Sequence, residues 1–161
     1  MISYLPLGIL YFISRGLYFL VFYIFSYREK VVIENLQNSL LGKSQKEIRK
    51  ITKLFFLHFF IIIMEIVKMI TAKRSFFLKR VHYNNLEILD DFFKKNQSIV
   101  MVLGHMNNWE WALASISIVS QQKVLGVYKK INNNFFSKIV LKSRSRFGAV
   151  LVTMEDSIHK I

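Results

Sequence analysis

The 161-residue sequence predicts an α/β chain, in which an N-terminal membrane helix and a helical segment precede a partial, mostly parallel sheet. Two observations predict this fold class. A long apolar run opens the chain, and after residue 75 short apolar runs without polar alternation take turns with helical patterns. We therefore expect a membrane anchor over 1–27, a helical membrane-proximal segment over 28–74 and the N-terminal part of an α/β domain over 75–161.

The composition favours a membrane-associated protein over a nucleic-acid-binding one. The chain has 23 Lys and Arg residues against 10 Asp and Glu, a formal net charge of +13, and 53% hydrophobic residues. A strongly cationic surface on so apolar a chain suits an anionic membrane surface, so we expect a membrane partner and no nucleic acid. The chain contains no cysteine, which excludes disulfides, thiol catalysis and Cys-based metal sites.

The run over residues 5–27 is long enough for a membrane-spanning helix and contains one charge, Arg15. That charge leaves open a second interpretation, an apolar helix that lies in the interface or packs against the rest of the protein. Basic residues follow the run, and by the positive-inside rule they place the body of the protein on the cytoplasmic side. They are Arg28, Lys30, Lys43, Lys46, Arg49, Lys50 and Lys53.

The helical segment is expected to contain two helices. The first runs over 28–41, and Gly42 follows it at a position typical of a helix C-terminal cap. Ser44 and Glu47 form the S-x-x-E capping box, which predicts the start of a second, longer helix that continues to about Ala72.

The last part of the chain alternates between strand-like and helix-like segments. This order, with strands that are apolar throughout, is typical of a parallel sheet. The expected strands are 78–83, 98–104, 124–128 and 149–154, and the expected helices are 84–96, 107–121 and 132–147. A sheet of so few strands leads us to expect an N-terminal portion of a longer domain.

The stretch GHMNNWEW at 104–111 follows the predicted strand 98–104, at the position where ligands gather in open α/β sheets. Asn107 or Asn108 would cap the next helix, with His105 just ahead of it and Glu110 in or beside its first turn. The carboxylate could then orient the imidazole, which would take a proton from a substrate hydroxyl. The alternative is a loop histidine followed by an ordinary capped helix. The histidine spacings do not indicate a metal site.

A basic stretch without acidic residues covers 123–146. Its members are Lys123, Lys129, Lys130, Lys138, Lys142, Arg144 and Arg146. We expect Arg144 and Arg146 to bind phosphate, because the guanidinium fork matches its oxygens. A solvated helix face is the alternative for the lysines.

Three segments resemble the bacterial lipid A biosynthesis lauroyl/myristoyl (late) acyltransferases, within the larger group of glycerolipid-type acyltransferases that carry H-x-x-x-x-D/E. GHMNNWEWA at 104–112 resembles the G-H-x-G-N-W-E block, with Asn107 in place of glycine. VYKKINNNFFSKIVLKSRSRFGA at 127–149 resembles the block that runs from V-Y-[RK] to R-x-R-x-G. YREKVVIENLQNSL at 27–40 is similar to the segment after the family's anchor.

The resemblance implies a sheet of the glycerolipid-acyltransferase type and the transfer of a fatty acyl chain from acyl carrier protein to a hydroxyl of a lipid A precursor. His105 would be the general base and Glu110 its partner. The substrate-binding residues would be Arg144, Arg146, Asn108 and Lys129. We expect no cofactor, no metal and a place in the bacterial inner (cytoplasmic) membrane. The alternatives are an acyltransferase for a glycerophospholipid or aminolipid acceptor and an inactive membrane-bound remnant.

Overall fold

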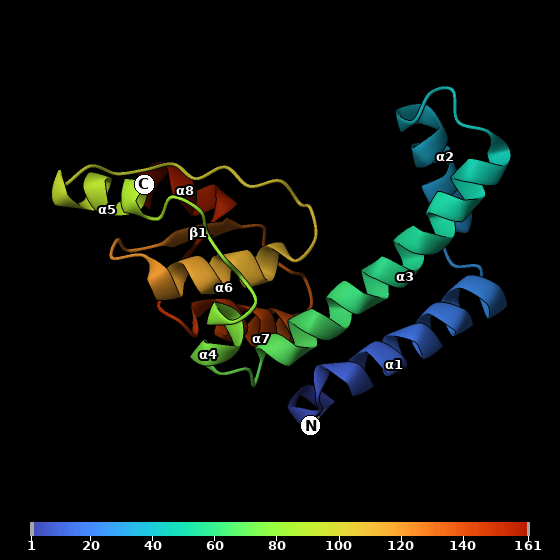
Figure 1. Cartoon of the computed structure of the whole chain (residues 1–161), viewed down its shortest axis with the longest axis horizontal. Coiled ribbons are helices and arrows are strands. Elements are labelled where there is room, and N and C mark those ends of the chain that lie inside the picture. The colour runs from blue at the N-terminus through green and yellow to red at the C-terminus, as the bar shows by residue number, and fades with distance from the viewer. Residues whose placement is uncertain (1, 161) are drawn as a thin grey trace. The chain divides into compact units, whose positions relative to one another are not determined.

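The computed structural model describes residues 2–160, and the chain divides between residues 68 and 69 into two compact units. The first unit is helical, and the second combines helices with one two-stranded parallel sheet (Figure 1). The predicted fold class is confirmed: a mostly helical α/β chain that opens with an apolar helix.

The first unit is built from two long helical stretches that run antiparallel (Figure 1). Phe22 packs with Phe56 and Phe60 in its core, and the Tyr11 hydroxyl donates to Oε1 of Glu65 at 2.8 Å. The elements are η1 (Ile2–Tyr4), α1 (Leu7–Phe19), the π-helical turn η2 (Leu20–Ile24), α2 (Glu29–Ser39) and α3 (Gln45–Met69), whose last residue already belongs to the second unit.

Leu7–Ile24 is, among residues 2–160, the one helical stretch long and apolar enough to cross a membrane. It has 18 residues, a mean hydropathy of 1.7, and only 17% of its residues are buried within the protein. By length and composition it agrees with the predicted span, and its low burial is unlike that of a core helix.

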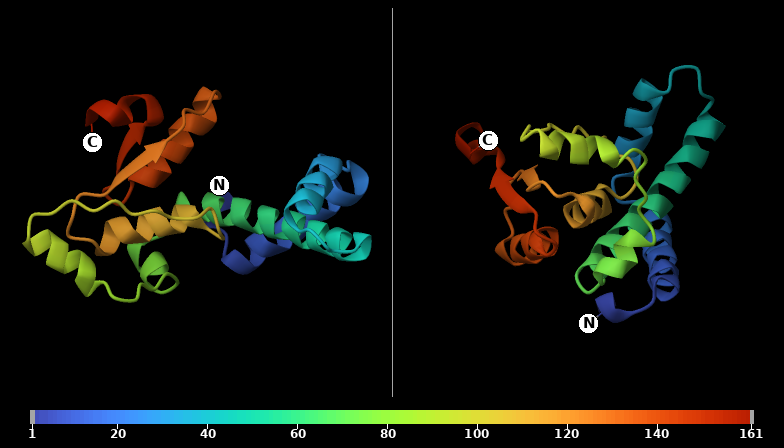
Figure 2. Two further views of the ribbon diagram at one scale, coloured as in Figure 1. Left: turned by 90° about the horizontal axis from the view of Figure 1, so that it is seen from above. Right: turned by 60° about the vertical axis from the view of Figure 1, so that its left-hand side comes forward.

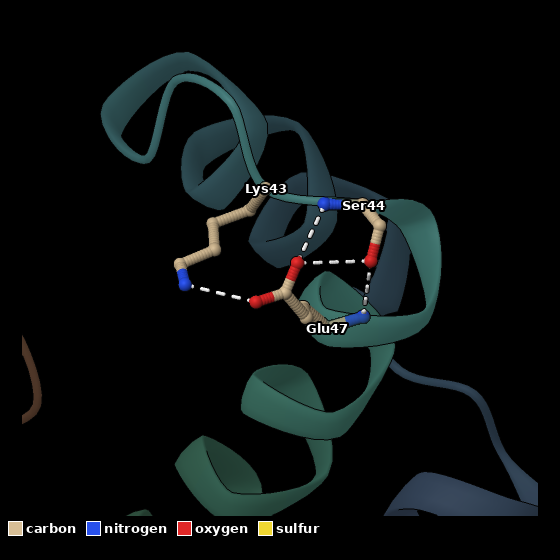
Figure 3. Close-up of polar contacts among 3 residues, drawn as sticks. All are labelled: Lys43, Ser44 and Glu47. Atoms are coloured by element: carbon tan, nitrogen blue, oxygen red, sulfur yellow. Dashed lines mark hydrogen bonds and ion pairs between the residues drawn. The ribbon is translucent and has the colours of Figure 1, made fainter.

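The turn between α2 and α3 shows why α3 starts where the sequence predicts (Figure 3). Ser44 and Glu47 form a reciprocal capping box, in which the main-chain N–H of Ser44 donates to Oε2 of Glu47 at 2.9 Å and the N–H of Glu47 donates to Oγ of Ser44 at 3.3 Å. Lys43 adds an ion pair to Glu47 at 2.8 Å. Gly42 has φ +85°, a left-handed conformation that suits glycine and turns the chain into this cap.

The second unit contains the predicted strands at 124–128 and 149–154, which pair in parallel from Leu125–Val150 to Tyr128–Thr153. Figure 2 shows them side by side. The elements are α4 (Arg74–Leu78), α5 (Glu87–Lys94), α6 (Trp109–Val119), β1 (Leu125–Tyr128), α7 (Asn134–Ser145), β2 (Val150–Thr153) and α8 (Met154–Lys160).

Two predicted strands are wrong. Over 78–83 the chain completes α4 and then turns. This is because Phe77 is fully buried against Trp111 and Phe147, and its carbonyl accepts hydrogen bonds from the main-chain N–H groups of Arg80 and Val81. Over 98–104 the chain pairs with no other strand among residues 2–160, and Val100 and Val102 are 86% and 90% exposed. An apolar run becomes a strand only where its main chain finds a partner.

Close packing of α6 on the sheet depends on Gly126 in β1. A Cβ atom there would lie 3.3 Å from Cδ2 of Leu151 and 3.4 Å from Cδ2 of Leu113. The missing side chain therefore lets α6 approach β1. Below α6, Trp111 packs edge-on against Phe76, with ring centroids 5.0 Å apart. These contacts fix the helix that carries the candidate site.

Candidate active site

His105 lies in the loop directly before α6 and is exposed. Its imidazole packs against the indole of Trp109, with ring centroids 4.8 Å apart and the planes tilted by 50°. Asn107, between them, has φ +55°, in the left-handed region that asparagine tolerates better than most residues. Asparagine can therefore replace the glycine of the block that this loop resembles.

The start of α6 is fixed by Asn108, one of the two caps that the sequence allows. Its Oδ1 accepts a hydrogen bond from the main-chain N–H of Trp111 at 3.1 Å. This cap satisfies one of the N–H groups that a helix start leaves unbonded. A role for Asn108 in substrate binding stays a prediction, and its capping oxygen is already bound by the helix.

Glu110, in the first turn of α6, is buried and pairs with Arg144 in the last turn of α7. Nε of Arg144 donates to Oε2 at 2.8 Å, and Nη2 donates to Oε1 in the second arm of the fork. The two side chains are 7% and 19% exposed. The hydrogen bond to Glu110 raises the pKa of Arg144, which is the guanidinium's response to a nearby anion.

The structure therefore brings together two predicted site residues that were expected to have separate roles. In the sequence interpretation, Glu110 orients His105 and Arg144 binds phosphate. Between residues 2 and 160, no hydrogen bond joins His105 to Glu110, whose carboxylate is turned to Arg144. Both catalytic assignments stay predictions, and a phosphate at Arg144 would have to compete with Glu110.

Arg146 and Lys129 lie outside this ion pair. Nη1 of Arg146 donates to the carbonyl oxygens of Met69 at 3.2 Å and Ile70 at 2.9 Å, and its guanidinium lies 5.3 Å from the ring centroid of Phe147. Arg146 thus binds main-chain carbonyls and is an exposed residue. Lys129 follows β1 directly and is exposed, at the carboxyl end of a parallel strand.

Two contacts could not be read from the sequence pattern. The partner of Glu110 is 34 residues away, and no local spacing connects them. The second contact is the packing of His105 on Trp109. Its one signal in the sequence is that Trp109 stands four residues after His105, at the start of a predicted helix. In chemical terms, the site offers an exposed imidazole for proton transfer and the N-terminal N–H groups of α6 for developing negative charge.

Searches of curated proteins and of solved structures find no match. The profile of one family, described as bacterial lipid A biosynthesis acyltransferase, matches residues 1–161, the whole length of the chain. That match covers the apolar N-terminal helix, the His105 loop, the Glu110–Arg144 ion pair and the parallel sheet. The chain therefore belongs to the bacterial lipid A biosynthesis acyltransferase family.

Proposed function

We propose that this acyltransferase moves a fatty acyl chain from acyl carrier protein to a hydroxyl of a lipid A precursor, with His105 as general base. The observation that carries the proposal is an exposed imidazole immediately ahead of a capped helix N-terminus, in a chain that the family profile matches throughout. Acyl transfer to an alcohol needs both parts, a base for the hydroxyl and donors for the oxyanion.

In the proposed reaction, His105 takes the proton of the acceptor hydroxyl while the hydroxyl oxygen attacks the thioester carbonyl. The carbonyl oxygen gains negative charge, which the positive end of α6 and its first N–H groups stabilise. When the tetrahedral intermediate collapses, the carbon–sulfur bond breaks and the imidazolium returns its proton to the leaving thiolate. An ester and a free carrier thiol result.

Glu110 and Arg144 are proposed to act as a positioning pair. Their fork ties the first turn of α6 to the last turn of α7, and the imidazole of His105 rests on Trp109 in that same first turn. A rigid first turn holds both the base and the oxyanion donors in place. Direct orientation of His105 by Glu110, as the sequence suggested, would require Glu110 to leave Arg144.

The acceptor is proposed to be bound by Arg146, Lys129 and Asn108. Arg146 and Lys129 are exposed cations, and phosphate on a lipid A precursor would suit both. The location proposed is the inner (cytoplasmic) membrane, with Leu7–Ile24 as anchor and the second unit on the cytoplasmic side, where acyl carrier protein is found. The basic residues after the span support that orientation.

The test is acyl transfer by the purified protein in detergent micelles. Radiolabelled acyl carrier protein would be the donor, and the acceptors would be a lipid A precursor, a glycerophospholipid and an aminolipid. We expect label on the lipid A precursor alone. Label on another acceptor would contradict the proposed substrate, and no transfer to any acceptor by folded protein would support the inactive remnant.

A further inference from the structure

We infer that the first unit carries a binding groove for the headgroups of anionic phospholipids. The groove lies between α2 and the first turns of α3 and has a volume of about 1010 Å³. Its five cations, here called the basic groove residues, are Lys30, Lys46, Arg49, Lys50 and Lys53. The inference goes beyond acyl transfer, because lipid binding there needs none of the residues proposed for catalysis.

The positive charge of the groove is concentrated by helix geometry. The four basic groove residues of α3 follow one another at i, i+3, i+4 and i+7, a spacing that places them on one helix face. Lys30 comes from α2, so two elements contribute to the same groove. All five residues are exposed to solvent and line the groove.

This charge is not neutralised within the protein. Over residues 2–160, no ion pair joins any of the five cations to a carboxylate. Glu29 and Glu47 also line the groove, but Glu47 is already paired with Lys43 and with the Ser44 cap. An anionic ligand would therefore meet an excess of positive charge, with four of the five cations on one face of α3.

The surroundings of the groove favour a lipid. Phe22, which lines it, lies in the last turn of the apolar stretch Leu7–Ile24. Near the same end, Tyr23, Phe25 and Tyr27 are exposed, as aromatic residues of a membrane interface are, and Nζ of Lys53 lies 5.7 Å from the ring centroid of Tyr23. A cluster of basic residues immediately beyond an apolar span is typical of binding to acidic lipid.

The experiment uses the full chain in micelles of a neutral detergent. Because the protein has no cysteine, Gln45→Cys introduces a single thiol for a fluorescent label on the groove lining. Dihexanoyl-phosphatidylglycerol, dihexanoyl-phosphatidylcholine and glycerol phosphate would be titrated separately. The test variant is Lys46→Gln/Arg49→Gln/Lys50→Gln. The matched control is Lys79→Gln/Lys95→Gln/Lys123→Gln, which changes three exposed lysines of the second unit.

Phosphatidylglycerol should bind the labelled chain saturably, and phosphatidylcholine should leave the label signal unchanged. The test variant should bind phosphatidylglycerol about a hundredfold more weakly, since each basic residue near an acidic surface is worth about fivefold in affinity. The control variant and His105→Ala should bind as the labelled parent does, which separates this inference from the proposed reaction. Circular dichroism would confirm that each variant is folded.

Several results would overturn the inference. Equal weakening in the control variant would show unspecific charge attraction, and equal binding of phosphatidylcholine would show that charge is not recognised. Saturation by glycerol phosphate at the same concentration would assign the groove to a soluble phosphate. A change in the label signal on addition of acyl carrier protein, without a response to phosphatidylglycerol, would assign the groove to a protein partner.

Discussion

Removal of the guanidinium at position 144 should destabilise the second unit strongly. In Arg144→Met, the Glu110 carboxylate, whose side chain is 7% exposed, loses both arms of its fork and stays buried without a counter-charge. Each charge-assisted hydrogen bond is worth about 1.5–3 kcal/mol, and breaking a buried ion pair from one side costs about 3–5 kcal/mol. We expect Arg144→Met to lower the free energy of unfolding by about 3–5 kcal/mol.

Two further variants separate the ion pair from other effects. Arg144→Met/Glu110→Leu removes both charges, so it should recover to within about 1–2 kcal/mol of the wild type, because no buried charge is left unpaired. Lys142→Met changes an exposed residue of the same helix and should cost less than about 0.5 kcal/mol. The difference in stability between Arg144→Met and the double variant measures the cost of leaving the buried Glu110 charge unpaired.

The assay is urea unfolding in detergent micelles followed by tryptophan fluorescence. Both tryptophans, Trp109 and Trp111, flank Glu110, so the signal reports on the second unit and on this helix start. A stability of Arg144→Met equal to that of Lys142→Met would refute the reasoning. So would a double variant that is less stable than Arg144→Met.

Three other substitutions test the caps and a basic residue. Asn108→Ala should lose about 1 kcal/mol in the same unfolding assay, and no loss would contradict its capping role. The ion pair with Lys43 and the bonds from Ser44 lower the pKa of Glu47 from 4.5 to about 2, so its stabilisation is complete above about pH 4.5 and is lost as the pH falls through 2. Over that interval the wild type should lose more helical circular dichroism than Glu47→Gln, and superimposable curves would argue against the box. Arg146→Met should raise the KM for a phosphorylated acceptor more than it lowers kcat, whereas an unchanged KM would leave only its carbonyl contacts.

Local signals in the sequence were sufficient for the starts of α3 and α6 and for the two paired strands. The Ser44–Glu47 box and the Asn108 cap are each formed within four residues, so local spacing predicts the box and narrows the cap to Asn107 or Asn108. The strands β1 and β2 are short apolar runs on either side of α7, which is the βαβ pattern that a parallel pair requires.

Long-range contacts decide the cases where the sequence failed. The apolar run 98–104 looks like a strand, but strand formation needs a neighbouring main chain, and the run itself does not encode one. Likewise, the five-residue spacing of His105 and Glu110 suggested a direct pair. The carboxylate instead meets a guanidinium 34 residues later, because a buried charge is stabilised best by a bidentate partner.

The measurement that tests the central claim most directly is single-turnover acyl transfer by His105→Ala and by His82→Ala. His82 is another exposed histidine of the second unit, so its variant controls for the loss of an imidazole elsewhere. With acyl carrier protein as donor and a lipid A precursor as acceptor, we expect His105→Ala to be slower by about 10²–10⁴-fold and His82→Ala to match the wild type. A folded His105→Ala protein that transfers the acyl chain at the wild-type rate would show that His105 is a loop residue before a capped helix and not the base.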